Sequence, residues 1–75
     1  MEDDSIITRV ERLGAAVRSA RKAQGLSQAR LAQMIGQSNG QAYITRIEAG
    51  NPVSITQIIK IADALGLKVS DLIDF

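Results

Sequence analysis

The stretch Gly25–Gly50, GLSQARLAQMIGQSNGQAYITRIEAG, predicts two short helices joined by a turn. Gly25 ends any helix that precedes it, because glycine enters the left-handed backbone conformation without a side-chain penalty. Ser27 is a suitable N-cap for the first short helix, which Gly36 ends after about two turns. A polar segment leads into the second short helix, which ends at Gly50. Two short helices with a tight polar joint are typical of the helix-turn-helix, in which the second helix lies in the DNA major groove.

Elsewhere in the chain, hydrophobic residues also recur three and four positions apart, which is the spacing of amphipathic helices. Asp4 or Ser5 is the expected start of a first helix, because acids and short polar residues favour a helix N-terminus. Its apolar stripe is Ile6, Val10, Leu13, Val17 and Ala20. The five helices expected are residues 5–24, 28–35, 41–48, 55–65 and 70–74, with no strand and no internal repeat.

The helix expected over residues 55–65 begins with a capping box of Ser54 and Gln57 and stops at Gly66. Its apolar set is broad and predicts a central helix buried on more than one side: Ile55, Ile58, Ile59, Ile61, Ala62 and Leu65. The core residues expected from the two short helices are Leu31, Ala32, Ile35, Ile44 and Ile47. The front turns of the first helix, with Ile6 and Ile7, either cover the core of their own chain or pack on a partner.

Length and composition exclude several classes of function. Seventy-five residues allow one small domain, residues 1–75, with no room for a ligand-binding domain. The chain contains no cysteine and no histidine, so disulfides, zinc–thiolate sites and the usual general base are excluded. We therefore expect neither an enzyme nor a cofactor. No apolar run approaches the ~18 residues of a membrane span, and we expect a cytoplasmic protein without membrane contact.

The charges are unevenly distributed along the chain. Residues 5–62 hold eight basic and two acidic side chains, a net +6, whereas residues 2–4 carry −3 and residues 63–75 carry −2. A basic middle between acidic ends fits a surface that binds a polyanion. Ordinary scatter of charge over a solvated surface is the alternative interpretation.

Several short motifs together resemble one family. They are Ser27-Gln28, Leu31-Ala32, Gly36, the run Tyr43-Ile44-Thr45-Arg46-Ile47-Glu48 before Gly50, Arg18-x-x-Arg21 in the first helix, and Lys60–Gly66 (KIADALG). Over residues 13–74 the chain is similar to the phage-repressor and Cro-type (XRE-like) helix-turn-helix family. The resemblance implies an all-α, compact five-helix lambda-repressor-like domain that binds double-stranded DNA.

The second short helix is expected to read the bases. Glutamine pairs with adenine, arginine pairs with guanine, and threonine or alanine methyl groups contact the thymine methyl. The expected base-contacting residues share one outward helical face: Gln41, Ala42, Thr45 and Arg46. Without the resemblance, the same residues would suit an ordinary solvated face.

The expected phosphate-contacting residues are Gln28, Arg18, Lys22, Arg30, Ser38, Asn39 and Tyr43. Gln28 resembles the family's phosphate-binding glutamine, although it would also suit the first turn of any helix. Tyr43 either reaches a phosphate or packs beside the preceding helix. Arg21 and Glu48 resemble the family's structural ion pair, which would hold the end of the recognition helix against the first helix.

One feature departs from the family pattern. The segment from Gly36 to Glu48 is about two residues longer than is usual, and the extra length falls in the turn Gln37–Gly40. Added loop length costs only a few tenths of a kcal/mol, so the fold is expected to survive. The depth at which the recognition helix enters the groove is the property that this turn could change.

The function expected is a transcriptional repressor that binds a palindromic operator as a homodimer. Its proposed interface is Val53, Leu67, Val69, Leu72, Ile73 and Phe75, although these side chains would equally close the core of a monomer. The alternatives are an antitoxin that represses its own operon and binds a toxin protein, and a protein-interaction module without DNA binding. A restriction–modification controller is a variant of the first possibility.

Overall fold

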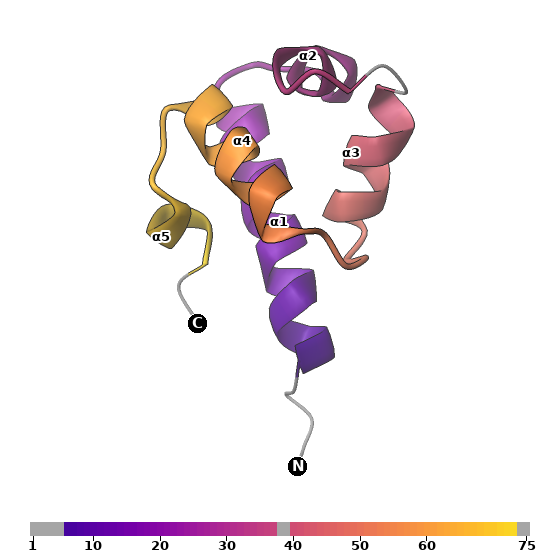
Figure 1. Cartoon of the computed structure of the whole chain (residues 1–75), viewed down its shortest axis with the longest axis vertical. Coiled ribbons are helices and arrows are strands. Elements are labelled where there is room, and N and C mark those ends of the chain that lie inside the picture. The colour runs from indigo at the N-terminus through magenta and orange to yellow at the C-terminus, as the bar shows by residue number, and fades with distance from the viewer. Residues whose placement is uncertain (1–5, 38–39, 74–75) are drawn as a thin grey trace.

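The computed structural model describes residues 6–37 and 40–73, and within these ranges the chain is all-α (Figure 1). Its helices are α1 (Ile6–Ala23), α2 (Gln28–Met34), α3 (Gln41–Glu48), α4 (Ile55–Leu65) and α5 (Val69–Leu72). The expected fold of five helices without strands is thus confirmed over the described residues. Ser5 and the end of the chain at residues 74–75, where helix boundaries were also expected, lie outside these ranges.

The boundaries of three helices differ slightly from those expected. α1 ends at Ala23 and α2 at Met34, each one residue early, because the last expected residue lies in the turn that closes the helix. α5 begins at Val69 instead of residue 70, and it ends at Leu72 instead of residue 74, because the backbone of Ile73 is extended. Its start is set by the Lys68 backbone N–H, which donates a hydrogen bond of 2.8 Å to Oδ2 of Asp71.

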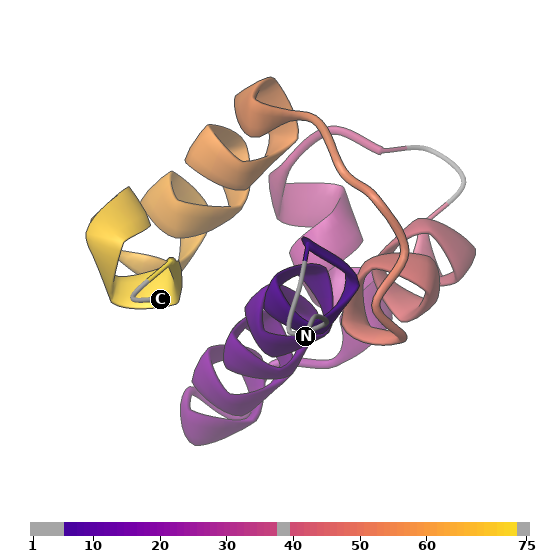
Figure 2. The ribbon, with the colours of Figure 1, turned by 90° about the horizontal axis from the view of Figure 1, so that it is seen from below.

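α1 is the longest helix, and the others are arranged around its C-terminal half (Figure 1). α2 and α3 pack on each other, and α3 also packs on α1. Figure 2 shows α1 between α3 on one side and the α4–α5 pair on the other. The end of α1 is further joined to the end of α4, because Nε2 of Gln24 donates a hydrogen bond of 2.6 Å to the Leu65 carbonyl.

The core between these helices is aliphatic. Its fully buried side chains include Val17 of α1, Leu31 of α2, Ile44 of α3, Ile58 and Ile61 of α4 and Leu72 of α5. All five residues expected from α2 and α3 are buried, including the C-cap residue Ile35. The helical periodicity therefore predicted the inward face of the helix-turn-helix correctly.

The prediction for α4 was wrong at two positions. Ile55 and Ile59 are 59% and 46% exposed, although the breadth of the apolar set predicted burial on more than one side. α4 packs on α1, α2 and α5 through the face that carries Ile58, Ile61 and Leu65. Ile55 and Ile59 lie one turn apart on another face, where no described element covers them. Ile6 and Ile7 in the first turn of α1 are likewise exposed, at 76% and 72%, so they do not cover the core of their own chain.

The expected N-cap residues form their hydrogen bonds. The Ser27 hydroxyl accepts one from the Arg30 backbone N–H (3.0 Å), and the Ser54 hydroxyl accepts one from the Gln57 backbone N–H (3.2 Å). The expected capping box at Ser54 is only half formed, because Oε1 of Gln57 is buried without a hydrogen-bond partner instead of accepting from the Ser54 backbone. Gly36 closes α2 with a φ of +77°. The backbone N–H groups of Gly36 and Gln37 then return to carbonyls in the last turn of α2, which is the Schellman arrangement.

α1 and α3 approach each other most closely at Gly14. A Cβ atom at this position would fall on the carbonyl oxygen of Ile47, and backbone atoms of Glu48 would lie 3.2 Å from it. Gly14 is therefore required for space rather than for backbone freedom, and it allows the end of α3 to lie directly against α1.

We expect Gly14→Ala to destabilise the fold by about 1–3 kcal/mol, because the new methyl group must push α3 away from α1. Urea unfolding would measure this loss. Alanine favours a helix interior over glycine by about 1 kcal/mol, which opposes the effect. The reverse change at the exposed neighbouring position, Ala15→Gly, measures that propensity difference in the same helix. A Gly14→Ala variant as stable as the wild type would contradict the close approach.

Candidate nucleic-acid interface

The outer face of α3 presents the four expected base-contacting side chains. Ile44 and Ile47 are buried beneath it, which orients the helix. The residues exposed on the opposite side are Gln41, Ala42, Thr45 and Arg46. Positions four apart lie one above the other on a helix, so Gln41 and Thr45 form one row and Ala42 and Arg46 form the next. Together they offer hydrogen-bond donors, acceptors and methyl groups to a ligand in front of the helix.

Arg21 and Glu48 form the expected ion pair between α1 and the end of α3. Nε of Arg21 donates to Oε2 of Glu48 (2.7 Å), and a terminal guanidinium nitrogen donates to Oε1 (3.0 Å). The other terminal nitrogen donates to the Leu26 carbonyl (2.7 Å), in the link between α1 and α2. Both side chains are buried, at 9% and 4% exposure. The hydrogen bonds that Arg21 donates to Glu48 raise the pKa of Arg21 against the opposing effect of burial, so the guanidinium stays charged.

Gln28 connects this ion pair to the outer face of α3. Its Nε2 donates a hydrogen bond of 3.1 Å to Oε1 of Glu48. Its Oε1 accepts from the Thr45 hydroxyl (2.8 Å) and, at a longer distance of 3.5 Å, from Nε2 of Gln41. A row of contacts thus runs from Arg21 inside the protein to two candidate base-reading residues at its surface.

The longer turn before α3 does not detach the helix from its scaffold. The Gly40 backbone N–H donates to the Gln37 carbonyl (3.1 Å), which ties the two described ends of the turn together. Gly40 is the N-cap of α3 and has a φ of +50°. Glu48 and Thr45 both reach their partners on α1 and α2, so α3 keeps its packing despite the added length.

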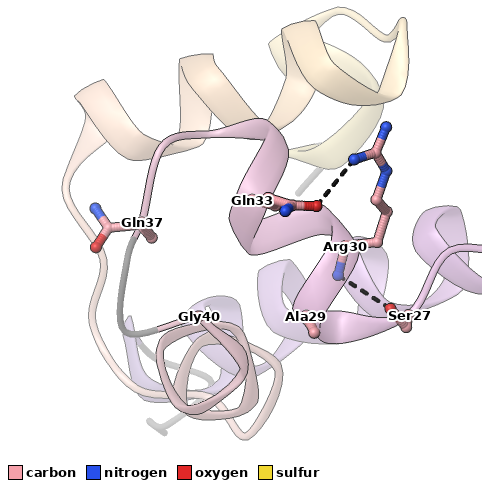
Figure 3. Close-up of a pocket in the computed structure, with 6 residues that line it drawn as sticks. All are labelled: Ser27, Ala29, Arg30, Gln33, Gln37 and Gly40. Atoms are coloured by element: carbon pink, nitrogen blue, oxygen red, sulfur yellow. Dashed lines mark hydrogen bonds between the residues drawn. The ribbon is translucent and has the colours of Figure 1, made fainter.

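A concave surface, which encloses a hollow of about 530 Å³, lies between α2 and the turn (Figure 3). It is lined by Ser27, Ala29, Arg30, Gln33, Gln37 and Gly40. Arg30 donates to Oε1 of Gln33 (2.9 Å), and Figure 3 shows Gln37 across the concavity from both. A smaller hollow of about 130 Å³ is lined by Gln37, Ala42, Tyr43 and Arg46. Gln37 therefore joins the α2 side of this surface to the outer face of α3.

Gln33 and Gln37 were not among the DNA-contacting residues expected from the sequence. The sequence could have indicated Gln33, since it lies three positions after Arg30 and therefore beside it on the polar face of α2. It could not have indicated Gln37, because this residue follows the end of α2, and its place beside both helices depends on the course of the turn.

The other expected phosphate-contacting residues differ in their surroundings. Arg18 and Lys22 are exposed on α1, as such a role needs. Tyr43 is half-buried and packs against the core. Burial raises the pKa of its hydroxyl, and the nearby Arg46 charge lowers it by a smaller amount. Ser38 and Asn39 lie outside the described residues.

The expected dimer-interface residues largely complete the core of their own chain. Leu72 is 1% exposed and has no surface left for a partner. The partly buried side chains packed against the core are Val53, Leu67, Val69 and Ile73. Phe75 lies outside the described residues. This arrangement matches the alternative interpretation, in which these side chains close a monomer's core.

The described part of the chain supports neither a metal site nor a membrane-spanning helix. Over residues 6–37 and 40–73, no group of three acidic, histidine or cysteine side chains is placed to hold a metal ion. Nor does any helix in these ranges combine the length and apolar character that crossing a membrane requires.

The family described as helix-turn-helix matches residues 17–72. The chain belongs to this family. It is therefore a DNA-binding transcription regulator of the XRE-like kind. No curated protein matches the chain.

Two solved structures share this helix-turn-helix fold. The restriction–modification controller protein C.AhdI from Aeromonas hydrophila is 33% identical, with a TM-score of 0.80, over 87% of this chain and 97% of that one. The hypothetical transcription factor NHTF from Neisseria is 27% identical, with a TM-score of 0.76, over 97% of this chain and 80% of that one.

Removing one partner of the Arg21–Glu48 pair should strand a buried charge. We expect Glu48→Ala and Arg21→Ala each to cost about 3–5 kcal/mol in free energy of unfolding. The double variant should cost less than the sum, because the second substitution removes a charge that is already unpaired. Urea unfolding of the four proteins measures this cycle. Arg30→Ala, at an exposed position, is a control expected within about 0.5 kcal/mol of the wild type. Additive single effects would show that the pair does not interact.

Proposed function

We propose that this helix-turn-helix protein is a sequence-specific repressor that binds a palindromic operator as a homodimer. The observation that carries the proposal is the outer face of α3. Three polar side chains stand exposed there on a helix that is fixed from behind by two buried isoleucines and by an ion pair to α1. A rigid helix with such a face suits the major groove, where base edges present donors, acceptors and methyl groups.

The surroundings of α3 support a division of labour in DNA binding. Gln41, Ala42, Thr45 and Arg46 would contact base edges. Arg30, with the concave surface beside it, and the exposed Arg18 and Lys22 would contact phosphates on either side. Gln28 and Tyr43 would contribute polar atoms at the edge of the same surface.

The apolar face of α4 supports dimerisation. Ile55 and Ile59 are two large side chains that stay exposed one turn apart. Fully burying an isoleucine side chain contributes about 1.5–3 kcal/mol. A two-fold axis beside α4 would bring the same pair from a second copy against them. Val53 and Ile73, which keep part of their surface exposed, would extend this interface beyond α4.

Control of a restriction–modification system is a second candidate function. The likeness to C.AhdI, at 33% identity over nearly all of that chain, favours it. DNA selected by the protein from a random pool would identify its site. Occurrence of that site upstream of paired methyltransferase and endonuclease genes would support the controller role. A reporter gene placed behind the site would distinguish repression from activation.

The central test is selection of double-stranded DNA from a random pool. We expect a two-fold symmetric consensus, and an affinity that falls steeply with salt because phosphate contacts release counterions. Enrichment of no sequence over the starting pool would overturn the proposal.

Removing a base contact and removing a phosphate contact should weaken DNA binding in different ways. Arg46→Ala should cost about 1–3 kcal/mol on the selected site and much less on random DNA. Lys22→Ala should weaken binding to all sequences together. It should also flatten the slope of log affinity against log salt by about one unit. If Arg46→Ala lost affinity equally for both DNAs, Arg46 would be a phosphate contact instead.

The dimer interface can be tested without DNA. Replacing Ile55 and Ile59 by glutamate should raise the dissociation constant of the dimer at least about tenfold, which corresponds to about 1.4 kcal/mol. Sedimentation equilibrium measures this constant. The matched control introduces glutamate at Ala15 and Ser19, which are also exposed and four residues apart on one helix, α1. A wild-type protein that stays monomeric at high concentration, both free and on DNA, would exclude the homodimer.

A further inference from the structure

The amide of Gln28 has a fixed direction. Its nitrogen faces Glu48 (3.1 Å) and its oxygen faces Thr45 (2.8 Å) and Gln41 (3.5 Å). An ionised carboxylate only accepts hydrogen bonds, so Glu48 requires the NH₂ end of the amide. The amide oxygen is thereby turned toward α3, and Gln28 presents an acceptor to the recognition helix.

Glu48 is itself unable to turn away. Both of its carboxylate oxygens are engaged by the Arg21 guanidinium, at 2.7 and 3.0 Å, and its side chain is 4% exposed. The same oxygen, Oε1, accepts from Arg21 and from Gln28. A planar guanidinium fork holding a carboxylate at two points leaves one geometry for the Gln28 amide.

The direction of this amide decides what Thr45 offers to DNA. The Thr45 hydroxyl has one hydrogen, and both of its described partners are acceptors: Oε1 of Gln28 at 2.8 Å and the Gln41 carbonyl at 2.9 Å. With its hydrogen held inside the protein, Thr45 presents only oxygen lone pairs and a methyl group outward. These suit a base edge with an amino group, or the methyl group of thymine.

Gln41 is affected in the same way. One N–H of its amide is directed to Oε1 of Gln28, at 3.5 Å. The other N–H and the amide oxygen remain, and they are the pair that a bidentate contact with adenine uses. Both members of the Gln41–Thr45 row therefore depend on the acceptor that Gln28 presents.

We propose that Glu48 is a specificity-positioning residue: by fixing the direction of the Gln28 amide, it sets the hydrogen-bonding character that Gln41 and Thr45 show to DNA. This inference rests on the proposed function. It goes beyond a structural ion pair, because it assigns base preference at one part of the site to a carboxylate that never touches DNA.

The test separates base preference from stability and overall affinity. Gln28→Met removes the amide but leaves the Arg21–Glu48 pair in place. Glu48→Gln allows the facing amide of Gln28 to reverse. In DNA selection, both variants should lose preference at least about fivefold at one base-pair position per half-site, the scale of one base contact. Preference at the position that Arg46→Ala affects should stay unchanged. Arg18→Ala is the matched control, expected to lower affinity without altering any preference.

A second measurement uses the free protein. In ¹⁵N-labelled protein, the Gln28 side-chain NH₂ signals should differ from those of exposed glutamines and should shift in Glu48→Gln. Signals like those of exposed glutamines would overturn the inference whether or not the protein binds DNA. If Gln28→Met selected the same consensus as the wild type and bound every site more weakly, the inference would be overturned while the proposed function stands. Failure of the wild type to select any sequence would remove both.

Discussion

The contact between the end of α3 and α1 is the constraint on which the other features depend. Gly14 and Arg21 are seven residues apart and therefore lie on one face of α1, two turns from each other. The first provides space for the backbone at Ile47 and Glu48, and the second binds the Glu48 carboxylate. Steric contact at one point and a charged pair at the other fix both the distance and the rotation of α3 relative to α1. The buried isoleucines of α3 would fit several rotations about its axis, whereas this two-point contact allows one.

The buried Arg21–Glu48 pair adds little net stability to a small aliphatic core. Taking two charges out of water costs several kcal/mol each, and the attraction between them roughly repays it. What the pair supplies is a definite geometry. It also draws in groups from three parts of the chain, since Arg21 holds the Leu26 carbonyl and Glu48 holds Gln28. The link between α1 and α2, the start of α2 and the end of α3 are therefore aligned by one cluster.

The sequence predicted the parts of the structure that depend on neighbouring residues. Helix order, the caps at Ser27 and Ser54 and the inward residues of α2 and α3 all follow from spacing and local hydrogen bonding. The Arg21–Glu48 pair was predicted from family resemblance. Periodicity could not show that Ile55 and Ile59 are exposed, because it finds apolar faces without indicating what covers them. Nor could it find the contacts of Gln28 with Glu48 and Thr45, which are 20 and 17 residues away and exist only once α2 and α3 are packed.

The outer face of α3 has consequences for how such a protein could acquire a new target sequence. Among the described residues, no hydrogen bond engages the side chain of Ala42 or Arg46, since the side chain of Asn51 binds Arg46 only at its backbone carbonyl. Either residue is therefore open to replacement one position at a time. The row of Gln41 and Thr45 is bonded to Gln28, and through it to the interior. A change there leaves a neighbour with an unmatched polar atom unless Gln28 changes too. Half of the proposed base-contacting surface can thus change by single substitutions, while the other half can change only together with a residue on a different helix.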